Sequence, residues 1–280
     1  MEDIVIVNQE KFEQIKAEMK KGGANNLHIL AGFDRTLTKT IVNGQKIRSL
    51  MSILRESDIM PEEYNQKAQE LFNHYHPIES DPLINQEEKK KLMKEWWGKM
   101  FNLMISFGFN KNHLQKIIDT KLIQFRDGAL EFFNNLKEKN IPLIIISASG
   151  VGEAIGLVFE KAEALSDNIF IISNVFEWGE KGQAIRPISP IIHSLNKDEV
   201  SMKDFPEIYP EIKNRKNVIL LGDNPDDINM VEGFEYDNLI KVGFLSENTE
   251  ENLEHYKEAF DVVILNDGSM DFVNKLTSEI

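Results

Sequence analysis

Residues 27–38 read Leu-His-Ile-Leu-Ala-Gly-Phe-Asp-Arg-Thr-Leu-Thr. This stretch is an apolar run that ends at Asp34 and a turn rich in threonine. Residues 217–227 repeat the pattern and read Asn-Val-Ile-Leu-Leu-Gly-Asp-Asn-Pro-Asp-Asp. Continuous apolar runs of this length are typical of strands that are covered on both faces, as they are in a parallel sheet. The two stretches therefore predict two buried strands that carry acidic residues at their carboxyl ends.

Further strand-like runs alternate with helical patterns along the chain. Apolar runs occur at 141–148, 169–175, 239–244 and 261–265. Helical spacing marks 9–21, which Gly22 and Gly23 end, and also 129–139 and 152–164. Alternating strands and helices imply crossover connections and a parallel sheet. We therefore predict an α/β fold with a Rossmann-like parallel sheet, whose ligands bind beyond the carboxyl ends of the strands.

Between about 45 and 125 the pattern changes to long segments with helical spacing. These segments are 45–56, 61–73, 86–107 and 112–120. Apolar residues recur there at intervals of three and four, as in Leu92, Trp96 and Met100. We predict a helical cap domain at 41–125, inserted into an α/β core domain formed by 1–40 and 126–280.

Composition limits the classes of function. The chain has 280 residues and a formal net charge of −14, which argues against binding to nucleic acid polymers. The absence of cysteine excludes disulfides, thiolate metal sites and cysteine nucleophiles. The chain lacks an apolar run of membrane-spanning length, and its first residues do not resemble a signal peptide. We expect a cytoplasmic protein that does not bind membranes and is a monomer.

Acidic residues close two of the predicted strands, and they indicate a metal site. Asp34 follows the first strand, and Asp223 and Asp227 follow the later one. Carboxylates that meet at one sheet edge repel each other, and Mg²⁺ prefers such hard oxygen ligands. We predict Mg²⁺ bound by Asp34, Asp223 and Asp227. The alternative is that these residues form turns and cap helices, as aspartate commonly does.

Two further features suit a bound phosphate. Ser147 ends an apolar run and could donate a hydrogen bond to a phosphate oxygen, and Ser149 in the same turn competes for that role. The turn leads through Gly150 and Gly152 into a helix N-terminus, which favours anions. Lys197 could neutralise phosphate as a point charge. The alternatives are an ordinary Ser-Gly turn and a solvated lysine.

Together these residues resemble the signatures of the haloacid-dehalogenase-like phosphatases. In that family the first signature is Asp-x-Asp-x-Thr, and its first Asp is the nucleophile. Gly32 stands at that position here. The resemblance implies that Asp34 is the general acid and base, that Ser147 and Lys197 bind phosphate, and that Asp223 and Asp227 act with Mg²⁺.

A narrower resemblance is to the cytosolic 5′-nucleotidase III family. Residues 74–82 read His-Tyr-His-Pro-Ile-Glu-Ser-Asp-Pro, and 94–97 read Lys-Glu-Trp-Trp. This family hydrolyses pyrimidine nucleoside monophosphates and, in one branch, 7-methylguanosine monophosphate. The resemblance implies that Glu79 recognises the base and that Trp97, or its neighbour Trp96, stacks on it. An indole would also attract the cationic ring of 7-methylguanine.

The resemblance also implies that the substrate phosphate lies on the turn after the second core strand, on Ser147, Ala148 and Ser149, beside Lys197. Gly32 can neither attack phosphorus nor ligate a metal, so the expected aspartyl-phosphate route is crippled. We therefore expect a phosphomonoester hydrolase scaffold for nucleoside 5′-monophosphates with impaired turnover. The alternatives are a catalytically inactive nucleotide-binding protein, a phosphatase of another small phosphate ester, and a purely structural acidic protein.

Overall fold

The computed structural model describes residues 4–47, 49–81, 83–197, 205–206, 208–232 and 235–280. The strands of its main sheet are Ile4–Ile6 (β1), Leu27–Ala31 (β2), Leu143–Ser147 (β5), Ile169–Ser173 (β6), Asn217–Gly222 (β9), Asn238–Leu245 (β10) and Val262–Leu265 (β11). They lie in the order β1-β11-β10-β9-β2-β5-β6. All neighbours pair in parallel except β1, which is antiparallel to β11 at one edge. The predicted α/β fold with a parallel sheet is confirmed, and the edge strand β1 is an addition to it.

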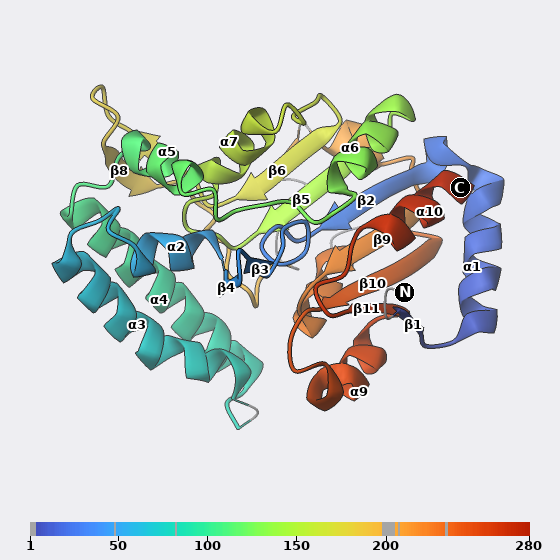
Figure 1. Ribbon diagram of the computed structural model, residues 1–280, viewed down its shortest axis with the longest axis horizontal. Helices are drawn as coiled ribbons and strands as arrows, with labels where there is room; N and C mark the ends of the chain where they lie inside the picture. The colour runs from blue at the N-terminus through green and yellow to red at the C-terminus, as the bar shows by residue number, and fades with distance from the viewer. Residues whose placement is uncertain (1–3, 48, 82, 198–204, 207, 233–234) are drawn as a thin grey trace.

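Helices cover both faces of this sheet, which explains the continuous apolar runs. Their bounds are Gln9–Gly22 (α1), Ala129–Glu138 (α6), Glu153–Lys161 (α7), Tyr209–Ile212 (α8), Thr249–Ala259 (α9) and Asp271–Glu279 (α10). In β2, Ile29 packs into the core with α1, α6, α7 and α10, whereas Leu30 packs with α8 and α9. Figure 1 shows α6 and α10 in front of the sheet. Each central strand is therefore apolar at successive positions because both of its faces are buried.

The segment between β2 and β5 is mainly helical. It contains the short strands Ile41–Val42 (β3) and Gln45–Lys46 (β4), and the helices Leu50–Glu56 (α2), Glu62–Ser80 (α3), Gln86–Ser106 (α4) and Lys111–Asp119 (α5). Helices α3 and α4 run side by side, and α2 and α4 lie on the side of the molecule toward which β5 and β6 point (Figure 1). The division of the chain into a core domain and a cap domain stays a prediction.

The prediction of one helical segment over 45–56 is wrong in its first half. Gln45–Lys46 forms β4, which pairs antiparallel with β3, and the helix begins only at Leu50. Asn43 and Gly44 connect the two strands with φ angles of 52° and 75°. Asn-Gly is the dipeptide preferred where both residues of a tight turn have positive φ. The signal for this hairpin was therefore present in the sequence.

A second hairpin was also not predicted. It consists of Phe176–Trp178 (β7) and Ala184–Pro187 (β8), which pair antiparallel with a register shift between Glu177 and Trp178. The predicted strand at 169–175 instead ends with β6 at Ser173. The end of the first predicted helix is confirmed, since Gly23 caps α1 with a φ of 63°. Among the described residues, the helices are all too short or too polar to cross a bilayer.

One buried arginine fixes the turn that follows β2. The Arg126 side chain is fully buried and forms an ion pair of 3.0 Å with Asp267, which follows β11. Its Nε donates to the carbonyl of Thr36 at 2.8 Å, and its Nη2 donates to the carbonyl of Arg35. Asp267 in turn accepts the backbone N–H of Thr40 at 2.9 Å. These hydrogen bonds and the ion pair connect the turn after β2 to the residues that follow β11.

Substitution of this arginine should destabilise the fold. Arg126→Met leaves Asp267 without its ion-pair partner and leaves buried carbonyls without donors, so we expect the free energy of unfolding to fall by about 3 kcal/mol or more. Urea unfolding followed by circular dichroism measures the change. Arg186→Met is the matched control, because its side chain is 74% exposed in an ion pair with Glu177, and it should cost less than about 0.5 kcal/mol. Equal losses for the two variants would contradict the role assigned to Arg126.

Candidate functional site

Three neighbouring strands deliver the predicted residues to one cavity. Gly32 follows β2, Ser147 ends β5 and Asp223 follows β9, and β2 lies between the other two strands. The cavity has a volume of about 270 Å³. It is lined by every predicted site residue, namely Gly32, Asp34, Glu79, Trp96, Trp97, Ser147, Ala148, Ser149, Lys197, Asp223 and Asp227. A larger cavity of about 520 Å³, beside α6 and α7, contains none of these residues.

Gly32 lies on the floor of the smaller cavity in a backbone conformation that other residues also adopt, since its φ is not positive. A Cβ at this position would lie 2.8 Å from Thr36 Oγ1 and 3.7 Å from Asp227 Oδ2. Thr36 is fully buried and its hydroxyl donates to Asp223, so this side chain would have to shift to accept a Cβ at residue 32. The backbone itself does not require glycine.

Asp34 connects the strand edge to the helical segment. Its Oδ1 accepts the backbone N–H of Leu50 at 2.9 Å, at the first turn of α2. Burial raises the pKa of Asp34 to about 7, and the nearby charge of Asp223 adds to this effect. The hydrogen bond from Leu50 and the charges of Arg35 and Lys197 act in the opposite direction. A carboxyl group with this pKa can both donate and accept a proton near neutral pH.

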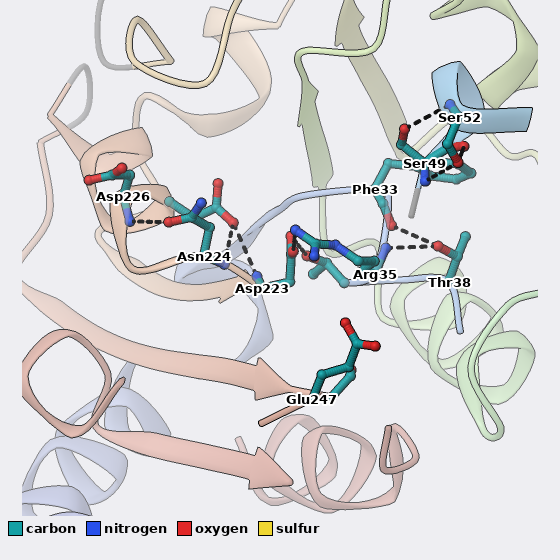
Figure 2. Close-up of polar contacts among 12 residues, drawn as sticks. Phe33, Arg35, Thr38, Ser49, Ser52, Asp223, Asn224, Asp226 and Glu247 are labelled. Atoms are coloured by element: carbon teal, nitrogen blue, oxygen red, sulfur yellow. Dashed lines mark hydrogen bonds and ion pairs between the residues drawn. The ribbon is translucent and has the colours of Figure 1, made fainter. Parts of the chain in front are cut away.

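Arg35 forms an ion pair with Asp223 that the sequence did not suggest. The two side chains meet with Arg35 Nη2 at 2.6 Å from Asp223 Oδ2, and Thr36 Oγ1 donates to the other carboxylate oxygen at 3.2 Å. Figure 2 shows the arginine extending from its turn toward Asp223. Burial raises the pKa of the Asp223 carboxyl, and the guanidinium opposes that rise.

Asp227 and Lys197 form a second ion pair in the cavity. Lys197 Nζ lies 2.6 Å from Asp227 Oδ1. Asp227 Oδ2 accepts the backbone N–H groups of Asp223 and Asn224, at 3.1 and 3.2 Å. Burial lowers the pKa of Lys197, but the carboxylates led by Asp227 outweigh it and leave the pKa raised. Lys197 is therefore held as a cation at the cavity wall.

The turn after β5 is fixed by an asparagine that the sequence analysis did not select. Ser147 and Ser149 are both buried, and Ser147 Oγ accepts the backbone N–H of Ser149 at 3.2 Å. Asn174 is 1% exposed, and its Nδ2 donates to the carbonyls of Ala148 and Ser149 and also, at 2.8 Å, to that of Ile192. One side chain thus joins the serine turn to the segment that carries Lys197. Asn174 lay inside the strand predicted at 169–175, which in the structure ends at Ser173, so its position after the strand was not recognised.

Helices α3 and α4 contribute the apolar side of the cavity. The rings of Tyr75, Trp96, Trp97 and Phe101 form a continuous stack, with neighbouring centroids 5.5–6.1 Å apart and planes within 27°. Trp97 also packs against the turn after β5, where a Cβ on Gly150 would lie only 2.5 Å from its ring. Both tryptophans therefore pack against protein and line the cavity.

Arg55 of α2 was also missed by the sequence analysis. Its side chain is 7% exposed, its guanidinium lies 4.0 Å from the centre of the Phe72 ring, and it forms an ion pair with Glu56. Arg55 and Phe72 both line the cavity near Glu79. A charged residue inside a short helical segment gives no sign in the sequence of which side it faces.

The acidic residues do not fit the predicted magnesium site. Among the residues that the structure describes, no three histidine, aspartate or glutamate side chains are grouped to hold a metal ion. Asp34, Asp223 and Asp227 line one cavity. However, Asp223 forms an ion pair with Arg35, and Asp227 forms one with Lys197. Gly32 has no side chain and so offers no oxygen ligand from one. Binding of Mg²⁺ by these three residues stays a prediction, and the pairing of two of them with basic side chains argues against it.

Comparison with known proteins identifies relatives along nearly the whole chain. The sequence pattern of the family described as "Pyrimidine 5'-nucleotidase (UMPH-1)" matches residues 35–280. The 7-methylguanosine phosphate-specific 5′-nucleotidase of Homo sapiens is 33% identical over 271 residues, which covers 96% of this chain and 90% of that protein. The B form from Xenopus laevis is 34% identical over 267 residues, covering 95% and 90%.

Solved structures show the same fold. Cytosolic 5′-nucleotidase IIIB bound to cytidine superposes with a TM-score of 0.90 at 29% identity, covering 100% of this chain and 94% of that one. A substrate-bound phosphoserine phosphatase has a TM-score of 0.55 at 18% identity, covering 89% and 97%, and so shares the fold alone. The resemblance to the 5′-nucleotidase family is confirmed by the family match and by the relatives, and the fold is shared with the phosphoserine phosphatase. The family match begins at Arg35, so it does not extend to Gly32.

The raised pKa of Asp34 predicts a pH-dependent cost of folding. Between the ordinary aspartate pKa of 3.8 and the folded value of about 7, the folded chain binds more protons than the unfolded chain, so stability falls as pH rises. Asp34→Asn keeps an acceptor for Leu50 without the charge. Its stability advantage over the natural chain should grow by roughly 3 kcal/mol between about pH 5 and pH 8.

Urea unfolding at the two pH values tests this expectation. Asp119→Asn is the control, because that side chain is 62% exposed and its substitution should give no comparable pH-dependent gain. An advantage of Asp34→Asn that does not change with pH would contradict the assignment.

Proposed function

Because the chain belongs to the pyrimidine 5′-nucleotidase family, we propose that its cavity binds a nucleoside 5′-monophosphate. The observation that carries the proposal is that one cavity is lined both by Ser147 and Lys197, which suit a phosphate, and by Glu79 and Trp97, which suit a base. A nucleoside monophosphate has the matching chemistry, with a dianionic phosphate at one end and a flat base at the other.

The phosphate would bind beside Ser147 and Lys197. Lys197 supplies a buried positive charge, and the Ser147 hydroxyl can donate a hydrogen bond to a phosphate oxygen. Backbone N–H groups of Ala148 and Ser149 would add neutral donors from the same turn. Asn174 holds this turn against the lysine segment, so the donors are positioned before the ligand arrives.

The base would bind beside Glu79 and Trp97. Glu79 is half-buried at the cavity wall, and a carboxylate there can accept a hydrogen bond from an exocyclic amino group. The indole of Trp97 offers a face on which a base can stack. The names of the relatives refer to 7-methylguanosine phosphate and to cytidine. We propose a pyrimidine or 7-methylguanine base for this chain.

Hydrolysis by this chain would be strongly impaired. Asp34 has a pKa suited to protonating the leaving oxygen of the nucleoside and then activating water. The attacking carboxylate expected at residue 32 is missing, and loss of a covalent nucleophile in another hydrolase costs about a millionfold in turnover. The chain would then act mainly as a nucleotide-binding protein. We expect this protein to be cytoplasmic and monomeric.

Gly32→Asp tests the proposed nucleophile position. The variant should release phosphate from cytidine or 7-methylguanosine 5′-monophosphate at least about 100-fold faster than the unsubstituted chain, because it supplies an attacking carboxylate. Phosphate release is measured over a panel of nucleoside monophosphates with Mg²⁺ present. Gly32→Asn is the control of equal size and should remain inactive. Efficient turnover by the unsubstituted chain would show that another group attacks phosphorus.

Glu79→Gln tests base recognition. The amide can no longer accept charge-assisted hydrogen bonds from an amino group, so the affinity for cytidine 5′-monophosphate should fall about tenfold, whereas that for ribose 5-phosphate should not change. Titration calorimetry measures both. Glu95→Gln on α4 is the control, since Glu95 is exposed and pairs with Lys99. Unchanged base selectivity in Glu79→Gln would favour a phosphatase of another small ester.

A further inference from the structure

Arg35 is positioned before any ligand binds, and its contacts explain how. Its backbone is in the left-handed region with a φ of 59°, and its N–H donates to Thr38 Oγ1 at 3.0 Å. The buried Arg126 side chain donates hydrogen bonds to the carbonyls of Arg35 and Thr36. The turn therefore directs the guanidinium toward the carboxyl edge of β9, where it meets Asp223 (Figure 2).

Two of the carboxylates that line the cavity are paired with basic side chains of the chain itself. Arg35 pairs with Asp223, and Lys197 pairs with Asp227, each at 2.6 Å. A divalent cation is required where several carboxylates converge without other positive charge. Here Gly32 contributes no carboxylate, and each of these two aspartates already faces one cation. Mg²⁺ also needs oxygen ligands in octahedral geometry, and Asp223 Oδ2 and Asp227 Oδ1 already face the cations Arg35 and Lys197.

The guanidinium can bind more than one anion. A guanidinium has five N–H donors in a planar fork, which suits phosphate oxygens as well as carboxylates. The recorded pairing with Asp223 is through Nη2. Arg35 also lines the cavity that contains Ser147 and Lys197. Its position at the ligand edge of the sheet therefore allows it to contact Asp223 and a bound phosphate together.

We propose that the Arg35 guanidinium takes the place of a divalent cation in this cavity, so that the chain binds the phosphate of a nucleoside monophosphate without a metal. This inference rests on the proposed function for the identity of the ligand. It adds a specific role for Arg35, which bridges the phosphate and Asp223.

Nucleotide affinity with and without metal tests the proposal. Titration calorimetry with cytidine and 7-methylguanosine 5′-monophosphate should give dissociation constants within about twofold in excess EDTA and in millimolar Mg²⁺. Arg35→Met should lose at least about tenfold in affinity in EDTA, because the phosphate loses a cation. Arg35→Lys keeps the charge without the fork and should lie between the two. Arg186→Met removes an ion-paired arginine outside the cavity and should bind as the natural chain does.

Direct metal binding provides a second measurement that does not depend on nucleotide. Mn²⁺ titration followed by electron paramagnetic resonance should detect no specific site in the natural chain. Gly32→Asp combined with Arg35→Met should bind Mn²⁺ at least about tenfold more tightly than Gly32→Asp alone, because the carboxylates lose their internal cation. Circular dichroism confirms that each variant is folded.

The outcomes separate this inference from the proposed function. Nucleotide binding that requires Mg²⁺, or an Arg35→Met chain that binds as tightly as the natural one in EDTA, would overturn the role of Arg35 and leave the nucleotide site intact. If no nucleotide binds under either condition, the proposed function fails. The Mn²⁺ comparison then still decides whether Arg35 substitutes for a metal, since equal Mn²⁺ affinity with and without Arg35 would refute it.

Discussion

The buried guanidinium of Arg126 is the contact on which the geometry of the cavity depends. The turn after β2 has a left-handed residue at Arg35, and a side chain supplies hydrogen bonds to its carbonyls at Arg35 and Thr36. Arg126 donates hydrogen bonds to the carbonyls of Arg35 and Thr36. Its charge is neutralised by an ion pair with Asp267, which follows β11. A buried arginine is stable only when its donors and its charge are satisfied together. The turn therefore has one arrangement, and the side chains that leave it have fixed directions.

Contacts made by this turn and by the turn after β5 position the polar residues of the cavity relative to the aromatic ones. Asp34 accepts the first N–H of α2, so the helical segment begins at a defined place over the strand edge. Trp97 on α4 packs on the turn after β5, close to Gly150, which has no side chain to obstruct the ring. Asn174 ties that same turn to the segment of Lys197. The polar and aromatic residues are thus joined through backbone hydrogen bonds and ring contacts.

The sequence predicted the parts of this structure that depend on local pattern. The central strands were recognisable because Ile29 and Leu30 pack on opposite faces, which makes the run continuously apolar. The predicted site residues were recognisable because they follow such strands. The pairing of Arg35 with Asp223 was not, because it joins residues far apart in the chain, and a single sequence does not show which acid an arginine meets. The β3–β4 hairpin was missed for a different reason, since its Asn-Gly turn signal was present and not used.

The glycine at residue 32 and the arginine at residue 35 act on the same charge balance. A carboxylate built on residue 32 would begin from a Cβ 3.7 Å from Asp227 Oδ2. The acids at this edge would then exceed the two cations Arg35 and Lys197, and a divalent ion would relieve the repulsion. With glycine at residue 32, Asp223 and Asp227 each pair with one cation, and burial raises the pKa of Asp34 to about 7. The proposed loss of the nucleophile at Gly32 would therefore also weaken the electrostatic reason to bind a metal, so the two proposed losses share one physical cause.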